Sequence, residues 1–234
     1  MTYLEICKAV RILSGAQGVG PASVVESDLS GYEVNLVAFV DTTYVDIQSS
    51  RDNFKFMRAD TQFSTVVDQE SYTCTGLLPG VGASDIKDIQ SIRIQDNGKW
   101  IYLCPLEYDE AEYRFLNTEE SGKPTYFSRV PGDSNGDKIQ LYPTPDAVYP
   151  AHIEYYRKPE VLEDNTDVPM LPEEFHLAIV YKAADRFASF LGSPEIDEEY
   201  KQAYKILSQK LYASQVPSRD MRPKNGRARR GFDI

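Results

Sequence analysis

The chain has 234 residues, of which 41% are hydrophobic, and it carries a formal net charge of −11. This length is enough for one large domain or two small ones with a proper hydrophobic core, and the composition is ordinary for a soluble protein apart from 16 tyrosines. Its apolar runs, such as Leu36 to Val40, are far too short to span a membrane, and its N-terminus lacks the basic start and apolar stretch of a signal peptide.

Charge is distributed unevenly along the chain. Residues 214–234 contain six basic and two acidic side chains, a net charge of +4, so the first 213 residues carry −15 to give the total of −11. We do not expect this acidic body to wrap nucleic acid, because phosphate binding requires a basic surface. The scattered cysteines Cys7, Cys74 and Cys104 form no Cys-x-x-Cys pair, which indicates free thiols in a reducing compartment such as the cytoplasm.

Two amphipathic helices are predicted in the first part of the chain. The first covers residues 3–13, and its apolar face consists of Ile6, Cys7, Val10 and Leu13. The second covers residues 33–50, and its apolar stripe consists of Val37, Val40, Tyr44 and Ile47. The glycines between them, Gly15, Gly18 and Gly20, follow a helix and not a strand, so they do not match a dinucleotide-binding loop.

From about residue 61 the hydrophobic period becomes that of strands. Seven short segments are rich in β-branched and aromatic residues: 61–67, 71–76, 89–95, 99–104, 124–130, 137–142 and 151–159. Turn signals separate them, and Asn97-Gly98 in particular predicts a tight hairpin. This spacing predicts an antiparallel sandwich or small barrel, with a helical crossing at residues 106–116.

After Pro159 the helical period returns. A helix is predicted from Pro172 to Leu191, with an apolar face of Phe175, Ile179, Ala183, Phe187 and Leu191. Its opposite face is a polar stripe, on which Lys182, Asp185 and Arg186 are candidates for an interface between subunits. Gly192 is expected to end this helix. A second, antiparallel helix follows, with an apolar face of Ile196, Tyr200, Ala203, Tyr204, Leu207 and Leu211.

These elements predict an α+β protein. Both chain ends, residues 1–58 and 170–213, build a helical module whose last part is a helical hairpin. An antiparallel β-sandwich or small barrel, residues 59–169, is inserted between them, and residues 214–234 form an extended basic tail.

Glu173 and His176 raise the possibility of a metal site, because Glu-x-x-His places both side chains on one helical face, as in di-iron bundles. Such a bundle needs a second copy of the motif, and the other histidine, His152, lies in a strand-like segment. Pro172, Glu173 and Glu174 are better explained as a helix start, since acids there face the positive end of the helix dipole. No metal and no other cofactor is therefore predicted.

Two further patterns resemble functional sites. Asp133, Asn135 and Asp137 alternate as calcium ligands do, but Lys138 occupies the position where a calcium loop needs glycine, so a hairpin turn at Asn135-Gly136 is preferred. The acids of "EYDEAEYR", residues 107–114, could supply a carboxylate pair for glycoside hydrolysis. No nucleophile elbow or phosphate-binding loop motif is present, and we predict that the protein is not an enzyme.

Several stretches resemble the head–tail adaptor (connector) proteins of tailed bacteriophages, related to the tail tubular protein A of T7-like phages. In the second half these stretches are "LYPTPD", "EYYRKPEVL" and "DVPMLPEEFHLAIVYKAA", followed by a last helix rich in Tyr and Leu. In the first half "LSGYEVNLVAFVDTTYVDIQSSRDNFKFMR" is similar to the early helix of these proteins, with an aromatic residue near Phe54. The resemblance extends over most of residues 1–212.

The resemblance implies a structural protein of the virion, made in the host cytoplasm. Such adaptors form a homo-oligomeric ring, usually of twelve copies, which binds the portal protein on one side and the tail or nozzle protein on the other. DNA passes through the channel without specific binding, and no membrane is involved. An acidic wall suits this passage, because it does not hold phosphates.

The basic tail has three interpretations: disorder, contact with DNA, or docking onto a partner. Its composition is typical of a segment that is disordered alone and orders on binding. Docking onto the portal is preferred, and the residues proposed for it are Arg219, Met221, Arg222, Lys224, Arg227, Arg229, Arg230 and Phe232. The alternatives for the whole chain are a carbohydrate-binding β-sandwich module, which usually exposes aromatic residues on one strand face, or a glycoside hydrolase.

Overall fold

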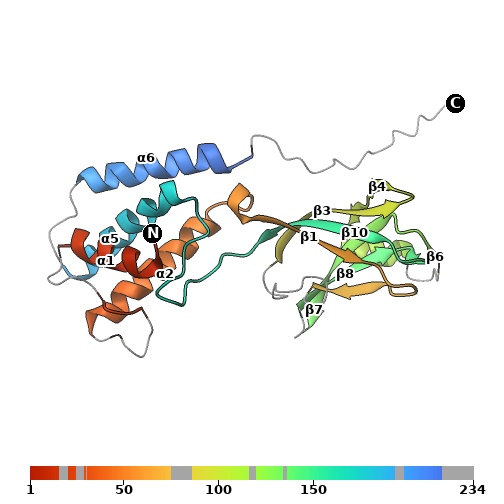
Figure 1. The fold of residues 1–234 in the computed structure, drawn as a ribbon, viewed down its shortest axis with the longest axis horizontal. Coiled ribbons are helices and arrows are strands. Elements are labelled where there is room, and N and C mark those ends of the chain that lie inside the picture. The colour runs from red at the N-terminus through yellow and green to blue at the C-terminus, as the bar shows by residue number, and fades with distance from the viewer. Residues whose placement is uncertain are drawn as a thin grey trace. The chain divides into compact units, whose positions relative to one another are not determined.

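The computed structural model describes residues 1–15, 21–24, 29, 31–74, 86–115, 120–133, 136–192 and 198–217 (Figure 1). The chain forms two compact units. Met1–Met57 and the segment that starts at Pro159 form one, here called the helical unit, and Arg58–Lys158 form the other, the β unit. The predicted α+β class, a helical module with an inserted β-sandwich, is confirmed, while the tail from residue 218 onward lies outside the described residues.

The helical unit begins with α1 (Tyr3–Leu13). Thr2 and Glu5 form a capping box, in which each side chain bonds the backbone N–H of the other residue. The predicted face of α1 is correct for Ile6, Cys7 and Val10, which are buried, whereas Leu13 is only half-buried.

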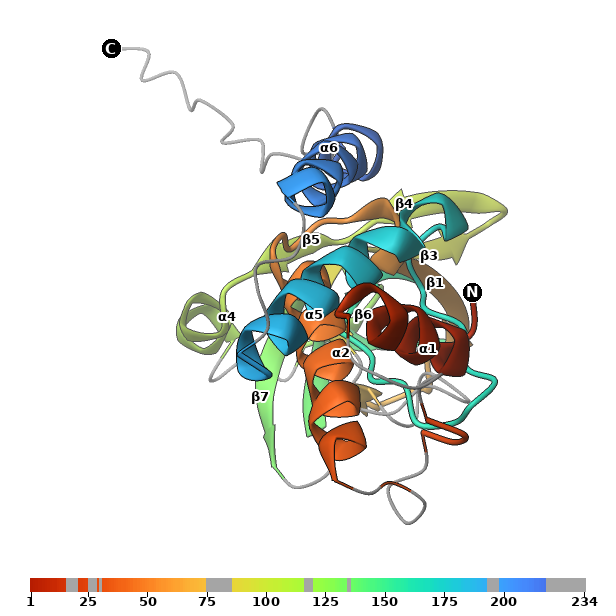
Figure 2. The ribbon, with the colours of Figure 1, turned by 90° about the vertical axis from the view of Figure 1, so that its left-hand side faces the viewer.

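The next helix, α2 (Tyr32–Ser49), and α1 both pack on α5 (His176–Phe190), as Figure 2 shows. All four residues of the predicted stripe of α2 are buried. The burial of α5 is wider than one stripe, because Ala178, Val180, Ala184 and Ala188 are buried beside the predicted Ile179, Ala183 and Phe187. Small alanines on a helix allow neighbouring helices to approach closely. Thus α5 is the central helix of the unit.

The start of α5 differs from the prediction. Pro172 precedes a short 3₁₀ turn, η4 (Glu173–Phe175), and the α-helix begins only at His176. The predicted end is correct, because Gly192 adopts a left-handed φ of 64° and its N–H bonds the carbonyl of Ser189.

The last helix, α6 (Glu198–Gln215), packs on α5 and runs antiparallel to it, as predicted (Figure 1). Its predicted apolar face is only partly correct: Leu211 is buried, but Tyr200, Ala203, Tyr204 and Leu207 are half-buried. Two tyrosines of this face nevertheless contact α5 through their rings, and Tyr204 does so with Lys182. Tyr200 stacks on Tyr181 with ring centroids 5.6 Å apart. The helix also extends beyond Ala213, into the segment predicted as tail.

The β unit starts directly after the 3₁₀ turn η2 (Lys55–Met57), and its described residues form two four-stranded sheets and one short strand pair. Sheet A has the order β1 (Arg58–Ser64), β10 (Pro150–Arg157), β3 (Ile86–Asp96) and β4 (Lys99–Tyr102). Sheet B has the order β2 (Ser71–Thr73), β8 (Gly136–Tyr142), β7 (Tyr126–Asp133) and β5 (Cys104–Leu106). The pair is β6 (Ser121–Gly122) with β9 (Thr144–Pro145), and α4 (Tyr108–Phe115) follows β5.

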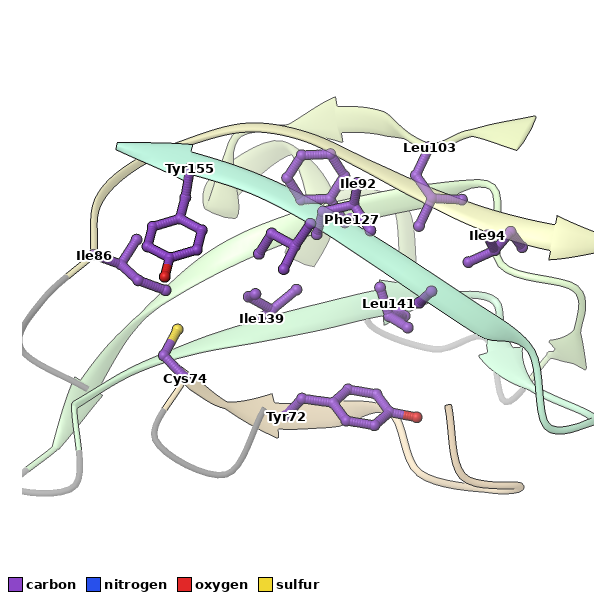
Figure 3. Packing of buried hydrophobic residues seen from close by; sticks show 12 residues of the cluster. Tyr72, Cys74, Ile86, Ile92, Ile94, Leu103, Phe127, Ile139, Leu141 and Tyr155 are labelled. Atoms are coloured by element: carbon purple, nitrogen blue, oxygen red, sulfur yellow. The ribbon is translucent and has the colours of Figure 1, made fainter. Parts of the chain in front are cut away.

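The two sheets enclose one hydrophobic core (Figure 3). Alternate residues of four strands belong to it: Ile92 and Ile94 from β3, Ile153 and Tyr155 from β10, and Phe127, Ile139 and Leu141 from β7 and β8. Because successive side chains of a strand point to opposite faces, their neighbours lie on the outer faces of the sandwich.

The strand pairing adds details that the sequence pattern did not predict. The segment 99–104 is not one strand, because the chain passes from sheet A to sheet B at the buried Leu103. There the N–H of Leu103 bonds Ile92 in sheet A, and that of Cys104 bonds Thr125 beside sheet B. Two pairings, β5 with β7 and β6 with β9, are parallel.

The predicted turns agree with the structure more closely than the predicted strands do. Asn97 and Gly98 have φ values of 48° and 78°, as the predicted tight hairpin between β3 and β4 requires. Strands β7 and β8 form a second hairpin that closes at the pair Asp133 and Gly136. Asn135, one of the three residues weighed as calcium ligands, lies outside the described residues.

Candidate interaction surfaces

The docking residues predicted in the tail lie outside the described residues: Arg219, Met221, Arg222, Lys224, Arg227, Arg229, Arg230 and Phe232. The helix that leads into this segment is well anchored. The ring of Tyr212 stacks on that of Phe54, with centroids 6.0 Å apart, and the guanidinium of Arg51 lies 5.5 Å from the Tyr212 centroid. The Lys55 ammonium bonds the carbonyl oxygen of Ser214 at 2.7 Å. The tail thus continues from a fixed helix end.

The polar stripe of α5 faces its own helical unit in part. The Arg186 guanidinium bonds Asp46 on α2, and this hydrogen bond holds the pKa of Asp46 below its usual value. The Lys182 ammonium lies 3.6 Å from Asp46 and 5.9 Å from the ring centroid of Tyr204 on α6, and burial lowers its pKa. Asp185 is half-buried. That these three residues also contact a neighbouring copy stays a prediction.

Glu173 and His176 do not converge on one point. The side chain of Glu173 is 89% exposed, whereas His176 is buried at 2%. His176 Nε2 donates to the carbonyl oxygen of Leu171 at 2.8 Å, and Nδ1 lies 2.9 Å from the terminal ammonium of Met1. Among the described residues no group of three or more His, Cys, Asp or Glu side chains could hold a metal ion. His176 serves to fasten the start of α5.

Replacement of His176 by alanine is expected to destabilise the protein by about 2 kcal/mol, because it leaves the buried carbonyl of Leu171 without a donor. Urea denaturation measures this change. Leu177→Ala is the matched control, since the adjacent Leu177 is 42% exposed and its change should stay within about 0.5 kcal/mol. Equal effects of both changes would show that the buried hydrogen bond contributes nothing.

Acidification tests the same histidine. Burial lowers the pKa of His176 in the folded protein, so the unfolded chain binds its proton first. The stability that neutral His176 provides is therefore present above the pKa of an ordinary histidine, about 6.5, and is lost as the pH falls through the folded value. His176→Ala should reduce the loss of stability between about pH 7 and pH 5, and an unchanged pH slope would contradict this assignment.

One cluster in the β unit was not recognised in the sequence. It lies on the outer face of sheet A and consists of Arg93, Trp100, Tyr102 and His152, here called the aromatic face. The Arg93 guanidinium lies 5.3 Å from the Trp100 ring centroid, and the His152 ring meets Trp100 edge-on at 6.3 Å. Trp100 and Tyr102 remain 42% and 54% exposed. Their i, i+2 spacing after the Asn97-Gly98 turn is the signal that could have revealed it.

Of the acids in the segment considered for glycoside hydrolysis, Asp109, Glu110 and Glu112 lie on α4 and Glu107 directly precedes it, and all four are exposed. Glu110 pairs with Arg114 at 2.6 Å, and Glu112 accepts a hydrogen bond from Tyr108 at 2.8 Å. This helix covers the outer face of sheet B, because Phe115 stacks on Tyr142 with ring centroids 4.6 Å apart. Tyr113 projects from α4 with 91% of its surface exposed. These are the features of an interaction surface more than of a catalytic pair.

None of the described helices has both the length and the apolar character needed to cross a membrane.

The sequence was also compared with known proteins. No curated protein matches the sequence significantly. A protein family, described as SU10 adaptor protein, matches residues 1–230. Because this match spans almost the whole chain and both of its units, the protein belongs to the SU10 adaptor protein family, a family of structural adaptors and not of enzymes.

Proposed function

We propose that this protein is the head-to-tail adaptor of a tailed phage. Copies of the chain, twelve by the resemblance, form a ring below the portal protein at the head–tail junction of the virion. The ring extends the DNA channel and presents the surface to which the tail or nozzle protein attaches. The observation that carries the proposal is the family match over residues 1–230.

The charge of the chain supports this role. DNA that moves through a channel must not be held by its phosphates, and a body with a net charge of −15 over residues 1–213, obtained as −11 minus +4, repels them. The same charge creates a difficulty, because identical acidic subunits repel one another and any acidic partner. The basic tail is the segment that offsets this repulsion, and we assign it to the portal.

The experiment is reconstitution with portal-bearing phage heads that lack the adaptor and the tail. The purified protein should add a ring below the portal, visible by electron microscopy, and should enable the tail protein to attach and the heads to retain their DNA. Binding to the tail protein alone, without any density below the portal, would contradict the proposal.

A carbohydrate-binding module is the second candidate, because Trp100 and Tyr102 are exposed on the same face of β4, as such modules require. The guanidinium of Arg93, however, occupies one face of the Trp100 ring, so a sugar cannot stack on that face. Trp100 is the sole tryptophan, so its fluorescence reports directly on this face. A shift of its emission on addition of mixed glycans would favour this function over the adaptor role.

A further inference from the structure

Two surfaces of the β unit lie on opposite outer faces of the sandwich. The aromatic face is on the outer side of sheet A, since Ile92 and Ile94 of the same strand as Arg93 point into the core. The helix α4 covers the outer side of sheet B, since Tyr142 alternates with the core residue Leu141 and is covered by Phe115. A copy of the chain therefore carries one surface on each side.

The polar atoms of the aromatic face are only partly hydrogen-bonded within the described part of the chain. Of its two neighbouring acids, Glu154 is bound by Arg58, and Asp60 lies 3.0 Å from His152 Nε2. The guanidinium of Arg93 is left with Glu154 as its nearest acid, 4.0 Å away. Within the described part of the chain, neither Arg93 Nε nor His152 Nδ1 has a hydrogen-bond partner, although His152 is only 6% exposed. Arg93 Nε is itself buried, but the Arg93 side chain as a whole is 28% exposed, so a carboxylate from outside meets the terminal nitrogens of the guanidinium, which can only donate.

The composition of this face is typical of an interface. Tryptophan, tyrosine and arginine provide most of the binding energy at protein contacts. The Arg93 guanidinium packs against one face of the Trp100 ring and the His152 ring meets it edge-on, so little conformational entropy is lost when a partner contacts the exposed part of the ring.

The surface of α4 has the complementary chemistry. Residues 107–115 contain four acids, Glu107, Asp109, Glu110 and Glu112, against Arg114, a net charge of −3. Asp109 and Glu110 lie one helical turn before Tyr113, whose ring is almost fully exposed. The buried Ala111 and the stacked Phe115 pack the helix against sheet B, so Tyr113 projects from an element that is anchored on the sandwich.

We propose that the aromatic face of one copy binds α4 of a second copy, with Tyr113 against Trp100 and Tyr102 and a carboxylate of α4 on Arg93. Because the two surfaces lie on opposite faces of the same unit, the contact is head-to-tail: each copy uses its aromatic face on one side and its α4 on the other. Such contacts produce a ring when the rotation between copies closes. This contact rests on the proposed function, for which it supplies the bond between neighbouring subunits.

Single substitutions test each half of the contact in concentrated solutions of the full chain, with association followed by sedimentation velocity. Trp100→Ala and Tyr113→Ala should each weaken self-association by at least about tenfold. Tyr113→Ala cannot act through misfolding, since the ring is 91% exposed. Tyr32→Ala, at an aromatic residue of the helical unit that is 60% exposed, is the matched control and should change nothing.

Mixing the two variants gives the sharpest result. A Tyr113→Ala copy keeps its aromatic face and a Trp100→Ala copy keeps its α4, so one intact contact forms between them. The mixture should give 1:1 dimers that grow no further, and the emission of Trp100, present in only one partner, should shift to the blue. Full rings formed by either variant alone, or a mixture that stays monomeric while the wild type associates, would overturn the proposal.

An experiment with portal-bearing heads distinguishes a failure of the proposed contact from a failure of the adaptor function on which it rests. Wild-type protein labelled with 5-hydroxytryptophan at Trp100 should show altered emission in the assembled ring. Failure of the wild type to attach to heads would contradict the adaptor function, while self-association in solution would still decide the contact. If the Trp100→Ala variant forms normal rings on heads, the proposed contact is wrong but the adaptor function stands. The contact is also wrong if glycans, and not assembly, shift the emission of the labelled wild type.

Discussion

A chain that ends after Pro217 is expected to fold normally and to lose its attachment to portal-bearing heads. Helix α6 ends at Gln215, so this cut keeps the ring stack of Tyr212 on Phe54 and the bond from Lys55 to Ser214. A cut after Ala213 would remove the acceptor of that bond. The expected loss of affinity is at least about hundredfold, because the arginines of the tail can each form charge-assisted hydrogen bonds worth about 1.5–3 kcal/mol.

Electron microscopy of heads mixed with full-length or truncated protein measures this loss. Charge reversal at Arg227, Arg229 and Arg230 should weaken attachment in the same direction. Their replacement by lysine should have a smaller effect, since lysine keeps the charge but cannot bind a carboxylate with two parallel hydrogen bonds. Normal attachment of the truncated chain would show that the adaptor docks through its folded body and that the tail has another use.

Local pattern was sufficient for most of the fold. The helices follow from apolar residues three and four positions apart, and Ile179 or Tyr44 could be placed in the core because nothing but a helix gives that spacing. The hairpin at Asn97-Gly98 was predictable because two consecutive positive φ angles strongly favour these residue types.

Long-range pairing limited the prediction elsewhere. Whether the chain continues in one strand at Leu103 or passes to another sheet depends on which carbonyls accept the N–H groups of Leu103 and Cys104, and these belong to Ile92 and Thr125. The tyrosines show the same limit. Tyr44 could have served a subunit interface, but it is fully buried, and its hydroxyl bonds Glu160, whose carboxylate also accepts the N–H of Met170. The contact with a half-buried carboxylate from a distant loop is not visible in the local sequence.

The interaction surfaces were the least predictable part, for a physical reason. Arg93, Trp100 and His152 come from three strands, and only the register of sheet A brings them together. The sequence pattern was sufficient to predict a charged stripe on α5. It was not sufficient to predict that Asp46 and Tyr204 contact part of this stripe. Polar residues on a helix face fit an internal ion pair and a subunit interface equally well.

Replacement of Ile179 by aspartate is expected to unfold the helical unit. Ile179 is fully buried in α5, the helix on which α1, α2 and α6 all pack. The change removes a large apolar side chain from the core, which costs about 2–5 kcal/mol, and places an unpaired carboxylate there, which costs several more. Together these costs match the whole stability of a typical domain, about 5–15 kcal/mol.

Circular dichroism and tryptophan fluorescence can follow the two units separately in this variant. The helical signal should be largely lost, whereas Trp100 lies in the β unit, whose core contains no residue of α5, and should keep its native emission. Leu177→Asp, on the same helix but at a position that is 42% exposed, is the matched control and should lower stability by no more than about 1 kcal/mol. An unchanged melting temperature for Ile179→Asp would mean that α5 is not the central helix of this unit.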